Sequence, residues 1–255
     1  MATLALFTVI MLFTVIMFVT MTISGVIGFA GNVIALPLLS QILDLSTAVA
    51  VLALSSFVQA VVQAVQNRKR IHWRELLIIV GFTCIGMPIG IFSLRYLPET
   101  ALKLLLGLFI LAVSALPFLV QLIRRGTSAP PQAKPWDWLY LIGGGFFSGA
   151  FASGGPLVVI YCTRHLPDKD VFRGTMFANG SFAMGLVALE HFMQKQYTAD
   201  TLLLTGIALL VMLAAVRTSS WIAQRADARK FNVLVNLALM LAGIMLLAQS
   251  VAPAA

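Results

Sequence analysis

The stretch "SGAFASGGPLVVIY", residues 148–161, places two adjacent glycines and a proline inside a segment that is otherwise apolar enough for a membrane helix. Glycine weakens a helix interior because its backbone loses more conformational freedom on folding. Proline removes a hydrogen-bond donor and clashes with the preceding turn. The sequence therefore predicts a helix break from Ser148 to Gly155, flanked by two short helices.

The chain around this break has the composition of a membrane protein. It is 60% hydrophobic and 10% charged, with a mean hydropathy of +0.97, whereas a soluble domain averages about 25% charged residues. A helix needs about 20 apolar residues to cross the hydrocarbon layer. We therefore expect an all-α integral membrane protein, with spans near 46–66, 75–94, 101–123, 174–190, 201–216 and 231–251. Length alone leaves two regions ambiguous, 1–43 and 138–163.

The charged and sulfur-containing residues exclude several function classes. The net charge of +8 comes from short clusters such as "NRKRIHWRE" (67–75), which are typical of cytoplasmic loops and not of a nucleic-acid interface. The chain has no P-loop, no CxxC, no HxxxH and no paired intramembrane carboxylates, and its three histidines lack the spacing of metal ligands. We therefore expect no nucleic-acid partner, no metal, no cofactor and no enzymatic activity.

The sequence repeats itself at an offset of 124 residues. This shift brings "SGVIGFAGN" (24–32) onto "SGAFASGGP" (148–156) and Asp44 onto Asp168. We predict a first repeat over 1–123, a polar cytoplasmic linker over 124–137 and a second repeat over 138–255. Each repeat would contain a broken helical hairpin followed by three transmembrane helices.

The distribution of Lys and Arg indicates how the segment 138–163 meets the membrane. If the segment crosses the membrane once, 8 of the 17 basic residues lie on the cytoplasmic side and 9 on the other side. If it turns back at the glycines, 14 of the 17 lie on the cytoplasmic side. Cytoplasmic loops carry the excess of basic residues. The count favours a V-shaped hairpin with arms 138–147 and 156–165, each about 15 Å long. A hairpin plus three spans then inverts the second repeat, although residues 1–23 are also long enough to span completely.

Two broken hairpins in inverted repeats are typical of a secondary transporter with a site near the membrane midplane. Each returning arm would start at its break, and a helix N-terminus offers free amide donors and partial positive charge to an anion. Neither break contains an acidic residue. The predicted anion-binding residues are Ser24, Gly25, Gly28, Gly31, Asn32, Ser148, Gly149, Ser153, Gly154 and Gly155. Close helix packing is the alternative explanation for the small residues.

A second, weaker set of polar residues lies on two of the predicted spans. Gln59 and Gln63 are one helical turn apart, and Asn179 and Ser181 lie on the corresponding span of the other repeat. These residues either line a pathway or join helices through hydrogen bonds.

Several segments in this order resemble the sulfite exporter TauE/SafE family, also called the 4-toluene sulfonate uptake permeases. They are the first break followed by "VIALPLL" (33–39), the basic loop "NRKRIHWRE", "GMPIGIFSLRYLPETALKLLLGLFIL" (86–111) and "FFSGAFASGGPLVV" (146–159). The resemblance implies a carrier of small anions such as sulfite, sulfonates, for example sulfoacetate, or related organic acids. It also implies a homodimer, in the plasma (inner) membrane with several spans. An anion channel and a structural or assembly protein remain open as alternatives.

Overall fold

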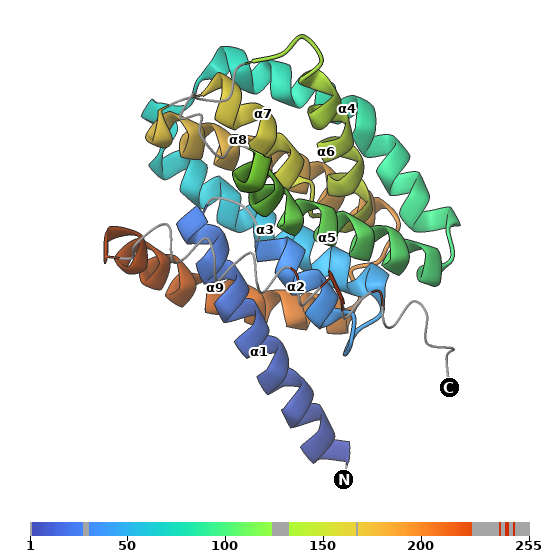
Figure 1. Ribbon diagram of the computed structural model, residues 1–255. Coiled ribbons are helices and arrows are strands. Elements are labelled where there is room, and N and C mark those ends of the chain that lie inside the picture. The colour runs from blue at the N-terminus through green and yellow to red at the C-terminus, as the bar shows by residue number, and fades with distance from the viewer. Residues whose placement is uncertain are drawn as a thin grey trace.

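The computed structural model describes residues 2–27, 31–123, 133–166 and 168–225, together with residues 240, 243, 244 and 247. All regular structure within these residues is helical, which confirms the predicted fold class. The elements are α1 (Ala2–Ile27), α2 (Gly31–Leu39), α3 (Leu45–Gln66), a 3-10 turn η1 (Arg68–Arg70), α4 (Trp73–Tyr96), α5 (Glu99–Ile123), α6 (Trp138–Phe151), α7 (Gly155–His165), α8 (Lys169–Met193) and α9 (Ala199–Arg225). Figure 1 shows them gathered into one bundle, from which the N-terminal end of α1 projects.

Four helices of the described chain are long and apolar enough to cross a membrane. They contain the segments Phe7–Val26, Leu45–Gln66, Trp73–Tyr96 and Ala199–Ser219, and the last three coincide with predicted spans. The predicted span 101–123 lies in α5, whose apolar described stretch, Thr100–Ala115, is shorter. The span 174–190 lies in α8, which is not among these four; this helix contains Lys169, Asp170, Arg173 and Glu190 together with Asn179. Most of the predicted span 231–251 and of the linker 124–137 lies outside the described residues.

Both predicted breaks lie between two helices, but they are narrower than the sequence indicated. α6 continues through Ser148 and Gly149 to Phe151, so the second break consists of residues 152–154 only. α1 likewise continues through Ser24, and α2 starts at Gly31. The extent predicted for each break was therefore wrong, because glycine and serine lower helix propensity without preventing a helix that tertiary packing supports.

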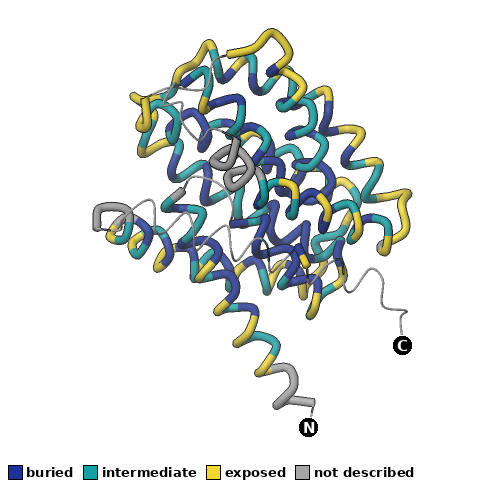
Figure 2. The backbone as a smooth tube through the Cα atoms, in the orientation of Figure 1, coloured by how far each residue is buried: buried dark blue, intermediate teal, exposed yellow. Residues whose placement is uncertain are grey.

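The two hairpins also differ in length. α1 has 26 residues and can span a membrane by itself, whereas its counterpart α6 has 14. Figure 2 shows that the N-terminal part of α1 is largely exposed where it leaves the bundle, and Phe7, Met11 and Val15 are among its exposed side chains. The sequence left open whether the first arm is long enough to span completely, and in the structure α1 has that length.

Helices of the two halves pack against each other more than against their own half. The most extensive contacts are α4 with α6, α3 with α8 and α1 with α9. α4 and α6 approach to backbone contact: a Cβ added at Gly90 would lie 2.0 Å from the carbonyl oxygen of Phe146, and one at Gly145 would lie 2.1 Å from that of Thr83. Small residues at such crossings are typical of helix packing in membranes.

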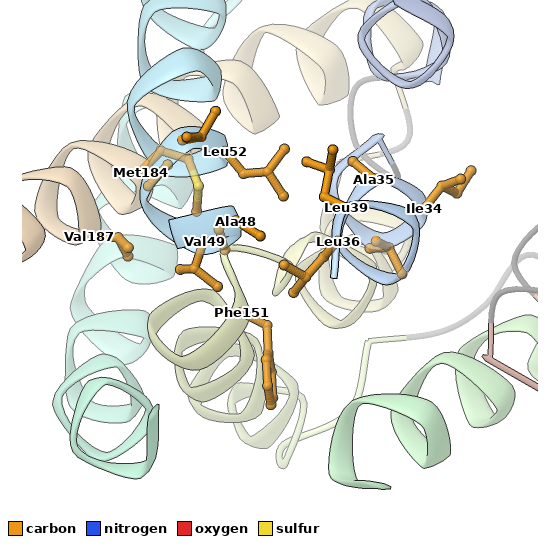
Figure 3. Packing of buried hydrophobic residues seen from close by; sticks show 14 of the residues in the cluster. Ile34, Ala35, Leu36, Leu39, Ala48, Val49, Leu52, Phe151, Met184 and Val187 are labelled. Carbon is orange, nitrogen blue, oxygen red and sulfur yellow. The ribbon is translucent and has the colours of Figure 1, made fainter. Parts of the chain in front are cut away.

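The main hydrophobic core lies where the two breaks meet. Leu36 of α2, Val49 of α3, Phe151 at the end of α6 and Met184 of α8 belong to one cluster of buried side chains, and Figure 3 shows them converging. Because this cluster joins elements from both halves, it holds the two breaks at a fixed separation.

Candidate functional site

A cavity of about 90 Å³ lies between the two helix breaks. A single water needs roughly 10–15 Å³ on a comparable measure, so the cavity can hold a small polyatomic solute. Apolar walls come from Val33, Phe177 and Met184. Ten predicted site residues line it: Ser24, Gly31, Asn32, Gln59, Gln63, Ser148, Ser153, Gly154, Gly155 and Asn179.

Three other predicted residues, Gly25, Gly149 and Ser181, do not line this cavity. A Cβ at Gly25 would lie 2.4 Å from Oγ of Ser219 in α9, and a Cβ at Gly149 would lie 2.4 Å from the carbonyl oxygen of Met87 in α4. Both glycines therefore permit a close helix crossing, as the packing alternative supposed. Ser181 donates a hydrogen bond from Oγ to the carbonyl of Phe177. Gly28 lies outside the described residues.

Two helices begin at the cavity wall. Gly31 is the first residue of α2 and Gly155 the first residue of α7, and both line the cavity. Amides in the first turn of a helix have no partner within the helix and carry partial positive charge. Pro156 lies in the first turn of α7, as predicted, where its missing N–H costs nothing. The cavity thus adjoins two helix ends that favour negative charge.

The second break ends α6 with a residue in the left-handed region. Ala152 has φ 51°, its N–H donates to the carbonyl of Ser148 at 2.9 Å, and the N–H of Ser153 donates to that of Phe147 at 3.2 Å. Glycine usually takes this position because a Cβ is strained there. These two hydrogen bonds stabilise the turn, and so does the close packing of Gly154. A Cβ added at Gly154 would lie 1.8 Å from the carbonyl oxygen of Gly144.

Two of the predicted side-chain donors already bind other protein groups. The Asn32 amide donates to the carbonyl of Ala152 at 2.8 Å and accepts a hydrogen bond from Ser56 Oγ, also at 2.8 Å. Ser153 Oγ donates to the carbonyl of Phe151 at 2.9 Å. These residues position the breaks. The Ser153 hydroxyl proton and one Asn32 amide proton are therefore occupied in the observed arrangement, and the second Asn32 N–H faces only Met184 Sδ, at 3.8 Å.

Four other polar side chains on the cavity wall have no partner within the part of the chain that the structure describes. These are the side chains of Ser24, Gln63, Ser148 and Asn179. None of them forms a hydrogen bond with a residue that the structure describes. Asn179 is 5% exposed, and its Oδ1 is enclosed without a donor. An unsatisfied buried polar group costs roughly 1–3 kcal/mol. Ser24 lies near the first break and Ser148 near the second, so each break contributes one hydroxyl without a partner among the described residues.

Ser56, Phe177 and Met184 are among the contributors to this site that sequence reasoning missed. Ser56, which fixes the Asn32 amide, had only a weak signal, because the segment "SSF" (55–57) resembles "GSF" (180–182) in the second half of the chain. Phe177 and Met184 carried no signal, because an apolar side chain on a membrane span is indistinguishable from a core residue until its neighbours are known. Among the residues that the structure describes, no group of His, Cys, Asp or Glu is arranged to hold a metal ion.

The chain is therefore a helical membrane protein in which two broken helices meet at a polar cavity, an arrangement typical of secondary transporters. The family model of the sulfite exporter TauE/SafE matches residues 12–246, and the chain belongs to this family. This is a family of membrane transporters for sulfite-like anions. Neither the curated proteins nor the solved structures contain a match to the chain.

Proposed function

We propose that this protein is a secondary transporter of small anions, with the transported anion bound in the cavity between the two helix breaks. Sulfite, sulfonates such as sulfoacetate, and related organic acids are the substrates that family membership favours. The observation that carries the proposal is the coincidence of two helix N-termini and four unpartnered polar side chains at one cavity. Amide and hydroxyl donors around a site without carboxylates suit an anion.

The proposed architecture is a pair of inverted repeats, 1–123 and 138–255. Helix contacts support it. In the proposed repeat α1 corresponds to α6, and α4 corresponds to α9. The extensive contact of α4 with α6 then has its counterpart in the contact of α9 with α1. Asp44 and Asp168, which align in the repeat, also have the same role. Each caps the N-terminus of its helix, through bonds to Thr47 N in α3 and Val171 N in α8.

The protein would reside in the plasma (inner) membrane as a multi-pass homodimer without enzymatic activity. In this setting the polar linker and the cluster Arg68–Arg70 would face the cytoplasm, in line with the excess of basic residues there. Inverted repeats allow the cavity to open alternately to the two sides while the bound anion stays near the midplane.

The proposal is tested by anion binding to purified protein. We would record thermal stability with sulfite, thiosulfate, sulfoacetate, taurine, lactate and chloride, for the wild type and for Ser148→Ala and Asn179→Leu. The expected result is stabilisation by at least one oxyanion, with affinity reduced roughly tenfold in either variant. Ser93→Ala is the matched control, because the Ser93 hydroxyl bonds to the Ile89 carbonyl within α4, away from the cavity. A wild type that no anion stabilises would contradict the proposal and leave packing as the role of the breaks.

An anion channel shares every feature of the cavity, so flux must distinguish it from a carrier. In proteoliposomes a carrier exchanges labelled sulfite for unlabelled sulfite faster than it catalyses net movement, and its rate saturates. A channel shows neither acceleration by substrate on the far side nor saturation at low concentration.

A further inference from the structure

Arg173 of α8 lies immediately beside the cavity without being part of its wall. Its Nη2 donates to the carbonyl oxygen of Gly25 at 3.2 Å, and its Cζ lies 5.9 Å from the ring centroid of Phe177. Phe177 and Ser24, the neighbour of Gly25 in the chain, both line the cavity. The guanidinium thus contacts α1 beside Ser24 and α8 at Phe177, and both residues belong to the cavity wall.

The Arg173 guanidinium has no anionic partner in the described part of the chain. The nearest acidic residue along α8, Asp170, pairs with Arg70 at 2.8 Å. Arg173 Nε is enclosed and makes no hydrogen bond with the described residues. The residue as a whole is half-buried. A charge that is partly removed from water without a counter-ion is disfavoured, and buried charges are ordinarily paired or bound to a ligand.

A structural role accounts for only part of this arrangement. Gly25 is close to the C-terminal end of α1, where carbonyls lack helix partners and a cation is favoured. This explains the bond from Nη2 but not the enclosed Nε.

The cavity wall itself lacks a formal charge. All of its residues that the structure describes are neutral, so a bound anion would receive only the partial charges of amides, hydroxyls and helix ends. A full positive charge close to such a site strengthens anion binding, particularly away from bulk water. An arginine also presents paired N–H donors that match an oxyanion through two parallel hydrogen bonds.

We propose that Arg173 is a substrate-binding residue that selects oxyanions at the edge of the cavity, between Ser24 and Phe177. A turn of the side chain away from Gly25 directs the free Nε–H and the adjacent Nη2–H toward the cavity. The anion then takes the place of the missing counter-ion. This inference rests on the proposed function, and it specifies the ligand as an oxyanion able to accept two hydrogen bonds.

The test is a sulfite titration of the purified protein in detergent by calorimetry, with Arg173→Gln, Arg173→Lys and the control Arg70→Gln. Arg70 carries the same charge at the same end of the bundle, but its side chain is 55% exposed and ion-paired. We expect Arg173→Gln to raise the Kd for sulfite by about tenfold or more. Arg173→Lys keeps the charge but loses the paired donors and should raise it by a smaller factor, while Arg70→Gln stays within about twofold.

The melting temperature, measured on the same samples, separates binding from helix capping. A residue that only caps α1 would lower the melting temperature on substitution and leave the Kd unchanged, and that result would overturn the inference while the proposed function stands. If Arg173→Gln does not fold, Arg173→Lys decides, since an unchanged Kd in that variant has the same meaning. If the wild type binds none of the anions in the panel, the proposed function and this inference both fail.

Discussion

The amide of Asn32 joins the two helix breaks directly: its Nδ2 lies 2.8 Å from the carbonyl oxygen of Ala152, 120 residues further along the chain. Asn32 is in the first turn of α2, and Ala152 is the left-handed residue that ends α6. The oxygen of the same amide, Oδ1, accepts a hydrogen bond from Ser56 Oγ of α3. One side chain thus links three elements around the cavity.

Removing this link should destabilise the fold. Asn32→Ala leaves the Ala152 carbonyl and the Ser56 hydroxyl without their partners, so we expect the free energy of unfolding to fall by about 1–3 kcal/mol. Denaturant titration in detergent measures this. Gln41→Ala is the control, because the Gln41 side chain is exposed and makes only a long bond, 3.3 Å, to the carbonyl of Pro37. Equal effects of the two substitutions would show that the Asn32 link does not hold the breaks together.

The return of the chain at the second break requires glycine at position 154. In Gly154→Ala the added Cβ would lie 1.8 Å from the carbonyl oxygen of Gly144 and 2.2 Å from Ser148 Oγ, so α7 must shift away from α6. We expect a loss of roughly 3 kcal/mol or more, at the upper end of the cost of overpacking. Thermal unfolding of Gly154→Ala and Gly206→Ala compares a crowded glycine with one that has no neighbour within 4 Å. The second substitution should be neutral or stabilising by up to about 1 kcal/mol.

The left-handed conformation of Ala152 predicts a stabilising substitution. Ala152→Gly removes the Cβ that is strained at φ 51°, and we expect a gain of about 1 kcal/mol in unfolding free energy. Ala150→Gly, two residues earlier in α6, should instead lose about 0.5–1 kcal/mol because glycine weakens a helix interior. Opposite signs in the same unfolding assay confirm the turn, whereas a loss in both variants would contradict it.

Asp137 and Arg164 form an ion pair that ties the start of α6 to the end of α7. The Asp137 side chain is 2% exposed and Arg164 is 17% exposed. Removing one partner of a buried pair costs roughly 3–5 kcal/mol, because the other charge stays uncompensated. We therefore expect Asp137→Asn to destabilise strongly. The exposed pair of Arg70 with Asp170 provides the comparison: Asp170→Asn should cost less than about 1 kcal/mol. Similar losses for both would mean that Asp137 contributes no more than a surface pair.

Much of the fold and most of the candidate site could be predicted from residue order alone. The apolar segments predicted the spans in α3, α4 and α9. Glycine with proline indicated the second break, and the internal repeat indicated the first. The repeat brought Ser24 and Ser148 into correspondence, and both line the cavity. The boundaries of the breaks could not be predicted, because packing of α6 on α4 keeps Ser148 and Gly149 helical despite their low propensity.

The sequence by itself determined three properties: that this chain enters a membrane, that its helices break near two glycine-rich segments, and that small polar residues gather at those breaks. These properties depend on local composition and spacing. Only the tertiary structure decided which polar groups are free. Asn32 and Ser153 are held by backbone carbonyls, Ser24 and Ser148 have no partner among the described residues, and Arg173 lies beside the cavity. Hydrogen-bond partners more than 100 residues apart depend on how the helices cross, and no local pattern encodes that distance.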